Sequence, residues 1–264
     1  MSGRLEDLRG PQVAETLGPD SVVVLPIGAI EQHGPHLPLS VDAVIAEEVA
    51  SAVLAAVGDD VDLWLLPTLE VSKSDEHTWL PGTLSLSGDT LSRVLDDLAR
   101  CVAATRARRL VFLNGHGGNS SLLSTACRDV RLAHGLLTFL VHPFVPPASG
   151  GPSTEEEFGF GIHGGLQETA LFAYLRPDEV EMRLAVRNVP EWMADNRWIR
   201  FGGPVQFGWT TRDFGVDGHV GDPTGATVEL GEQLFGEVVE ALADQMREIA
   251  LFEFPDAEPA GSTG

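Results

Sequence analysis

Short apolar runs alternate along this chain with longer segments of helical periodicity, and this order constrains the fold more than any other feature. Four runs rich in Val and Leu have the length of buried strands: residues 21–27, 62–67, 109–113 and 136–142. Between them, residues 42–57, 89–106 and 119–133 repeat apolar side chains at intervals of three and four. A β-α-β-α-β-α-β order predicts an α/β fold, with a mainly parallel sheet and helices on both faces.

Polar residues directly follow two of these strands. Glu31 and His33 come just after the first strand, and His116 comes just after the third. In open parallel sheets, ligands bind beyond the carboxyl ends of the strands. The sequence therefore predicts a ligand site at this edge of the sheet.

The first of these segments, LPIGAIEQHGPHLPLSVD, contains two carboxylates and an imidazole. Glu31 and His33 are two residues apart, so on an extended segment they share a face. Asp42 falls near the N-cap of the next helix, where a capping role alone would explain it. His36 lies between two prolines and is a weaker candidate. Carboxylates and imidazoles are typical ligands of Zn²⁺ and Mn²⁺, and the two oxygens of Asp42 could bridge a pair of ions.

Glycines surround the single histidine of the second segment, NGHGGN. They permit a close approach of the backbone to a metal or a substrate. His116 is the side chain suited to a metal, whereas Asn114 and Asn119 fit a turn and a helix cap. No Lys or Arg accompanies the glycines, which disfavours a phosphate-binding loop.

The third segment, GIHGGLQETALF, places His163 and Glu168 five residues apart. A glutamate at a helix start is also stabilised by the helix dipole, so Glu168 is either a ligand or a surface residue of that helix. The helix is expected over residues 166–175, and a long C-terminal helix over 224–252.

A polar loop follows the second strand and is predicted to reach the same edge. Its residues Glu76, His77 and Trp79 are candidate substrate contacts, although a plain solvated loop would look the same. Trp209 and the run GDPTGAT could form a pocket wall, an oligomer contact or a helix cap. Residues 144–161, rich in Pro, Gly and acids, are expected to form a long loop or lid over the site.

The net charge of −22 over 264 residues disfavours nucleic acid and anionic membranes as partners, because both need clustered basic residues. We expect no secretory signal and no membrane span. Cys101 and Cys127 lack a CxxC partner and are expected to be buried thiols of a cytoplasmic protein. Residues 1–254 are expected to form one domain, followed by a disordered tail over 255–264.

In combination, GAIEQHGPHLPLSVD, PGTLSL, NGHGGN, HGGLQET and GDPTGAT resemble the creatininase (creatinine amidohydrolase) family. The resemblance covers residue 21 to about residue 227. It implies a creatininase-like single α/β domain, two divalent metal ions (Zn²⁺, with Mn²⁺ or Fe²⁺), and a homohexamer that cleaves C–N amide bonds of a small molecule.

Carried over to this chain, the resemblance implies that Glu31 and His116 bind one ion and His33 the other, with Asp42 between them. Creatininase itself has a glutamate where this chain has Gly118, and Glu168 is the obvious substitute ligand. The family often also has a glutamate at the position of Leu166. Both departures argue against creatinine as the substrate. Glu168 could instead relay protons.

The implied reaction is hydrolysis of a cyclic amide, a formamide or a small peptide. Two cations would lower the pKa of bound water toward ~7, and His163 would act as general acid toward the leaving nitrogen. The alternatives are a C–C hydrolase acting on a cyclic keto-inositol, and a non-catalytic metal-binding subunit.

Overall fold

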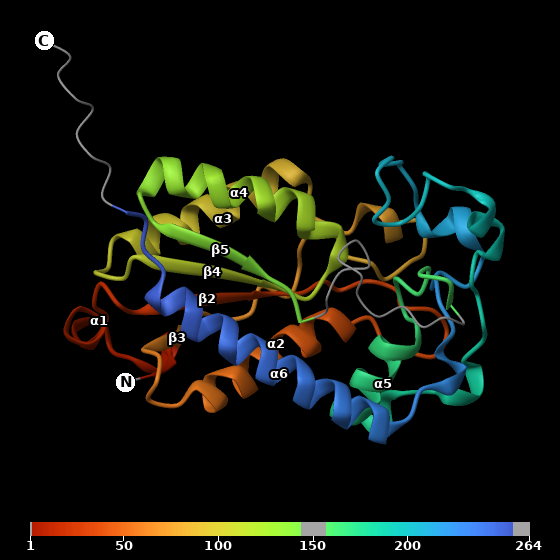
Figure 1. Ribbon diagram of the computed structural model, residues 1–264, viewed down its shortest axis with the longest axis horizontal. Helices are drawn as coiled ribbons and strands as arrows, with labels where there is room; N and C mark the ends of the chain where they lie inside the picture. The colour runs from red at the N-terminus through yellow and green to blue at the C-terminus, as the bar shows by residue number, and fades with distance from the viewer. Residues whose placement is uncertain (1, 144–156, 256–264) are drawn as a thin grey trace, which may run out of the picture.

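The computed structural model describes residues 2–143 and 157–255, and its centre is a five-stranded parallel sheet with the order β1-β3-β2-β4-β5 (Figure 1). The strands are β1 (Gly3–Arg4), β2 (Val22–Ile27), β3 (Leu63–Leu65), β4 (Arg109–Asn114) and β5 (Leu137–Val141). The four predicted strands and their parallel pairing are confirmed. The sequence did not reveal β1, which is two residues long and pairs with β3.

Helices cover both faces of the sheet, as predicted. They are α1 (Gly10–Thr16), α2 (Val41–Val57), α3 (Gly88–Ala103), α4 (Ser120–His134), α5 (Leu166–Leu175) and α6 (Val228–Leu251). One apolar core joins one face of the sheet to α2, α5 and α6, and a second joins the opposite face to α3 and α4 (Figure 1). The α6 helix begins four residues later than predicted, because Pro223–Gly225 forms a separate short 3₁₀ turn and Thr227 caps the helix by accepting from Leu230 N.

The register of the two central strands brings two of the predicted site segments together. Ile27 at the end of β2 pairs with Asn114 at the end of β4, and Gly115 N then donates to Ile27 O. Gly28 lies against the first turn of α2, where an added Cβ would be 2.7 Å from the carbonyl carbon of Asp42. The missing side chain at Gly28 therefore lets α2 start close to the strand ends, with Asp42 facing His116.

Three local expectations need correction. Asp42 is not an N-cap: Ser40 has that position, and Asp42 is a buried residue of the first turn of α2. Asn119 precedes α4 as expected, but its side chain donates to Ser72 and Asn114 instead of capping the helix. Cys127 is half-buried, and Cys101 is exposed because it lies outside the buried stripe of α3.

Some expectations fall on residues that are not described. Residues 144–156 of the predicted lid and residues 256–264 of the predicted tail lie outside the described part of the chain. Within the described part, every helix is too short or too polar to cross a membrane.

A buried arginine at the start of β4 ties the end of α6 to the sheet. The guanidinium of Arg109 donates to the carbonyls of Pro19, Ile249 and Phe252 and to the carboxylate of Glu253. It is 2% exposed, so water cannot replace these bonds.

We expect Arg109→Met to lower the free energy of unfolding by roughly 3–5 kcal/mol, because it leaves buried carbonyls without a donor. Urea denaturation monitored by circular dichroism would measure the loss. Arg247→Met is the matched control, since Arg247 is a half-exposed arginine of α6 paired with Asp60 and Asp244 and should cost less than about 1 kcal/mol. Equal losses in the two variants would contradict the role given to Arg109.

Candidate metal centre

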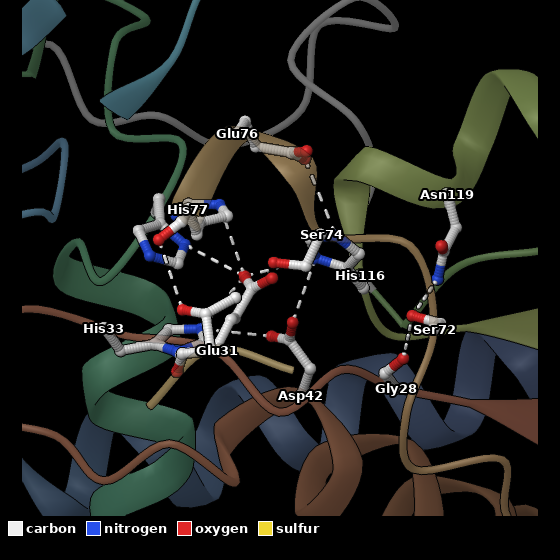
Figure 2. Close-up of polar contacts among 12 residues, drawn as sticks. Gly28, Glu31, His33, Asp42, Ser72, Ser74, Glu76, His77, His116 and Asn119 are labelled. Atoms are coloured by element: carbon white, nitrogen blue, oxygen red, sulfur yellow. Dashed lines mark hydrogen bonds and ion pairs between the residues drawn. The ribbon is translucent and has the colours of Figure 1, made fainter. Parts of the chain in front are cut away.

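Carboxylates and imidazoles from four separate segments converge at the carboxyl edge of the sheet (Figure 2). Glu31 and His33 follow β2, Asp42 starts α2, and His116 follows β4. The fourth segment supplies His163, just before α5, and Glu168 in its first turn. Many of these residues line a cavity of about 340 Å³, whose described walls are Glu31, Asp42, Glu76, His77, His116, Gly117, Gly118, Ser120, Ile162, His163, Glu168, Phe201, Gly202, Gln206 and Trp209.

Asp42 lies between two histidines, with one carboxylate oxygen directed at each. Its Oδ1 is 3.2 Å from His33 Nε2, and its Oδ2 is 3.0 Å from His116 Nδ1. Burial would raise the pKa of Asp42, but the two histidines hold it below its usual range. The residue is therefore a carboxylate with both oxygens facing ligand-type nitrogens.

Glu31 is fully buried and surrounded by imidazoles. Its Oε1 is 3.2 Å from His116 Nδ1, 3.4 Å from His77 Nε2 and 3.6 Å from His163 Nδ1. Apart from these rings, both Glu31 oxygens and Asp42 Oδ2 lack a hydrogen-bond donor among the described residues. Buried carboxylate oxygens without donors are costly unless a proton or a cation lies between them and the nitrogens. This donor set fits divalent cations.

Backbone carbonyls fix which nitrogen of each ring faces the centre. Glu31 O is 3.0 Å from His33 Nδ1, Lys73 O is 3.0 Å from His116 Nε2, and Gln32 O is 2.6 Å from His163 Nε2. A carbonyl can only accept, so each of these nitrogens carries its ring's proton. The opposite nitrogen of each ring is then available to a ligand, as in metal sites whose outer hydrogen bonds orient the histidines.

Ligand atoms within 4.8 Å of one another form overlapping groups in this centre. One group is Glu31, Asp42 and His116, and a second is His33, Asp42 and Glu168. Asp42 belongs to both. These two groups have the composition that the family resemblance implied for two ions. A third combination joins Glu31 and His33 to His163, so His163 could also be a ligand by position.

The two carboxylate oxygens of Glu168 have different surroundings. Its Oε2 accepts from Gly164 N at 2.5 Å, which satisfies a backbone donor ahead of α5. Its Oε1 lies 3.8 Å from His33 Nε2 and is directed into the centre. One carboxylate can thus hold the helix start and still offer an oxygen to a cation.

The protonation of the centre follows from its burial and its charges. Burial raises the pKa of Glu31 to about 7. Burial alone would lower the pKa of His33 and His116, but Asp42 and Glu168 outweigh it at His33, and Glu31 and Asp42 outweigh it at His116. Both imidazole pKa values are therefore well above the usual value. Burial, together with His77 and His33, lowers the pKa of His163 well below its usual value.

The two candidate substrate contacts have different surroundings. His77 is buried in the cavity wall, with its Nδ1 2.9 Å from Gln32 Nε2 and its ring centroid 4.0 Å from that of His163. Trp79 is not among the described residues that line the cavity, and its indole donates to Thr211 Oγ1 at 2.9 Å. It braces the loop, whereas His77 faces the site. His36 bonds Thr169 Oγ1 and belongs to none of the metal groups.

Sequence reasoning missed part of the cavity wall. Phe201 and Gln206 line the cavity together with Trp209, for which several roles had been left open. Gln32 was also missed: its side chain donates to Gly218 O at 2.7 Å and accepts from Gly34 N at 3.1 Å, which holds the segment between Glu31 and His33 in place. No periodicity or motif marks Phe201 and Gln206, whereas Gln32 lies within the first motif, between two candidate ligands.

Comparisons with known proteins agree with this geometry. A family model described as creatinine amidohydrolase matches residues 6–246. A mycofactocin precursor peptide peptidase of Mycolicibacterium smegmatis is 33% identical over 229 residues, which cover 86% of this chain and 84% of that protein. The creatinine amidohydrolase of Pseudomonas putida is 33% identical over 253 residues, covering 89% of this chain and 91% of that protein.

Solved structures show the same fold. A creatininase described as the Mn form is 27% identical with a TM-score of 0.71, covering 94% of this chain and 98% of that one. A mutant creatininase of the Zn–Zn type is also 27% identical, with a TM-score of 0.72 and the same coverage. The chain therefore belongs to the creatininase (creatinine amidohydrolase) family.

Proposed function

We propose that this protein is a binuclear metal-dependent hydrolase that cleaves a C–N amide bond. The observation that carries the proposal is the position of Asp42, whose two buried oxygens face His33 and His116, each within a separate group of ligand atoms. Glu31, Asp42 and His116 would hold one ion, and His33, Asp42 and Glu168 the other. Zn²⁺ and Mn²⁺ are the first candidates, because both occur in the solved creatininases.

Two such ions would supply an acidified water and a positive charge for the oxygen of the attacked carbonyl. The protein's own contribution to proton transfer is His163. Its Nε2–H is committed to the carbonyl of Gln32, so Nδ1 is the nitrogen that faces Glu31 and the cavity. The low pKa of His163 leaves Nδ1 unprotonated at rest, so Nδ1 would take a proton from the attacking water and, as a strong acid once protonated, would give it to the leaving nitrogen.

Short peptides and small amides are the substrates that we favour. The relatives include both peptide peptidases and a creatinine amidohydrolase at about the same identity. Gly118 and Leu166 stand where creatininase-type sequences have glutamates, which disfavours creatinine. A cavity of about 340 Å³ accommodates a small molecule or one to two residues of a peptide.

Metal analysis and a substrate panel test the proposal together. Purified protein should retain about two divalent ions per chain after dialysis, measured by plasma mass spectrometry. The loaded protein should hydrolyse members of a panel of short peptides, formamides and lactams and leave cyclic ketones intact. Fewer than about one ion per chain would contradict the binuclear centre, and cleavage of the ketone alone would favour C–C hydrolysis.

Metal binding should release protons and strengthen as the pH rises. Glu31 has a pKa of about 7, and His33 and His116 have raised values, so the metal-free centre holds protons near neutral pH that a cation must displace. Affinity should therefore fall below pH 7, by about tenfold per pH unit for each proton released. Calorimetric titration of Zn²⁺ at pH 6.5, in two buffers of different ionisation enthalpy, measures the number of protons. Binding heats that do not depend on the buffer would contradict this expectation.

A further inference from the structure

Glu76 is a carboxylate of the cavity that has no part in the metal groups. Glu31, Asp42 and Glu168 also line the cavity, and all three belong to those groups. The Glu76 side chain is 13% exposed, and its Oε1 is 3.6 Å from His116 Nε2. That nitrogen already faces the carbonyl of Lys73, so His116 does not need Glu76 as a partner. Figure 2 shows Glu76 above His116, on the side away from Asp42.

Gly118 leaves the room that the Glu76 side chain occupies. A Cβ at position 118 would collide with Glu76 Oε1 and lie 2.9 Å from its Cδ. The absence of a side chain at 118 therefore permits Glu76 to extend over this part of the cavity wall. Glu76 comes from the short helix Asp75–His77, and Gly118 from the turn that precedes α4.

The backbone of Glu76 is tied to the aromatic part of the wall. Thr211 Oγ1 lies 3.2 Å from Glu76 O and donates to it. Thr211 follows Trp209 by two residues, and Trp209 packs edge-on against Phe201 with ring centroids 5.4 Å apart. Both aromatic rings line the cavity that Glu76 enters. The Glu76 carboxylate and the two aromatic rings thus belong to one connected part of the cavity wall.

The charges of the cavity favour a cationic ligand. No Lys or Arg is found among the described lining residues, and the sequence of residues 144–156 contains none either. The carboxylates of the two metal groups would face the ions, which leaves Glu76 as the remaining carboxylate of the described cavity wall. An anionic substituent would therefore have no side-chain cation among the described lining residues to pair with, whereas a cationic one would have the Glu76 carboxylate and the aromatic faces.

We propose that Glu76 determines specificity by accepting hydrogen bonds from a positively charged nitrogen group of the substrate. This proposal rests on the proposed amide hydrolysis. The group is an ammonium, amidinium or guanidinium near the scissile amide. The adjoining apolar part of the substrate packs against Phe201 and Trp209. Carboxylate-bearing amides of the same size are poor substrates.

Binding of simple probes tests Glu76 without requiring turnover. The Zn²⁺-loaded protein is titrated with n-butylguanidinium, n-pentanol and butyrate, followed by ligand-observed NMR. Wild type should prefer the guanidinium, and Glu76→Gln should weaken its binding by roughly tenfold to a hundredfold, the range for a charge-assisted hydrogen bond. Pentanol binding should stay the same. Glu70→Gln, the same substitution at an exposed glutamate outside the cavity, should behave as wild type.

Two further outcomes would overturn the role of Glu76. One is equal guanidinium binding by wild type and Glu76→Gln. The other is a loss of bound Zn²⁺ in Glu76→Gln, which would mean that Glu76 acts through His116. A matched set of amides that carry an amine, a hydroxyl or a carboxylate then tests turnover. If no protein hydrolyses any of them while the guanidinium preference still depends on Glu76, the proposed amide hydrolysis fails and the binding role stands.

Discussion

Asp42→Asn should lose both metal ions and nearly all hydrolytic activity. The amide keeps the volume of the carboxylate, so the buried first turn of α2 is preserved. It carries no negative charge, however, and it presents an NH₂ group to His33 or His116, where the carboxylate had an oxygen for each. We expect kcat/KM to fall by at least about 10³-fold, since metal activation of water and carbonyl supplies several kcal/mol of the barrier reduction.

Metal content per chain and kcat/KM are to be measured on the same preparations. Asp89→Asn is the matched control, because Asp89 is also in the first turn of a helix but is exposed on α3. It should retain metal and activity. An Asp42→Asn protein with two bound ions would refute the shared role of Asp42, and one that loses a single ion would restrict Asp42 to one group.

His163→Ala should separate catalysis from metal binding. Its Nδ1 is assigned to proton transfer, so its removal should lower kcat by about 10²–10⁴-fold, the usual contribution of a general acid–base group. The two ligand groups that contain Asp42 do not include His163. The metal content should therefore stay at the wild-type value.

The same two measurements decide between the two possible roles of His163. Loss of one ion in His163→Ala would mean that the alternative group of Glu31, His33 and His163 is the real ligand set. His134→Ala provides the control, because His134 is at the end of α4 and pairs with Asp96. It should change neither quantity.

The regular part of the fold could be predicted from the sequence because each element there buries a continuous apolar stripe or run. The six residues of β2 are all buried, and α3 buries Leu91, Leu95 and Ala99 at helical spacing. The segment between α5 and α6 has no such pattern. It is built from short 3₁₀ turns around a small core of Met193, Phe214 and Val220, which Phe160 joins from the segment before α5.

The residues of the proposed metal groups could be predicted from the sequence, whereas much of the remaining cavity wall could not. Glu31, His33 and His116 follow strands β2 and β4, and Asp42 starts the next helix, so topology brings these four to one edge, whereas Glu168 lies in α5, which does not directly follow β2 or β4. Phe201 and Trp209 reach the cavity only through the packing of the irregular segment. Trp79 is close in sequence to His77, yet it is not among the described residues that line the cavity, and its indole donates to Thr211 Oγ1.

The separation of the site residues along the chain bears on how the protein matures. The carbonyl of Gln32 accepts a hydrogen bond from His163, which lies 131 positions later in the chain, and Glu168 comes later still. A ribosome that has released only the first half of the polypeptide has exposed Glu31, His33, Asp42 and His116 but not the residue that completes the second group. On the proposed assignment, the second metal group is therefore complete only after α5 has been synthesised and has docked.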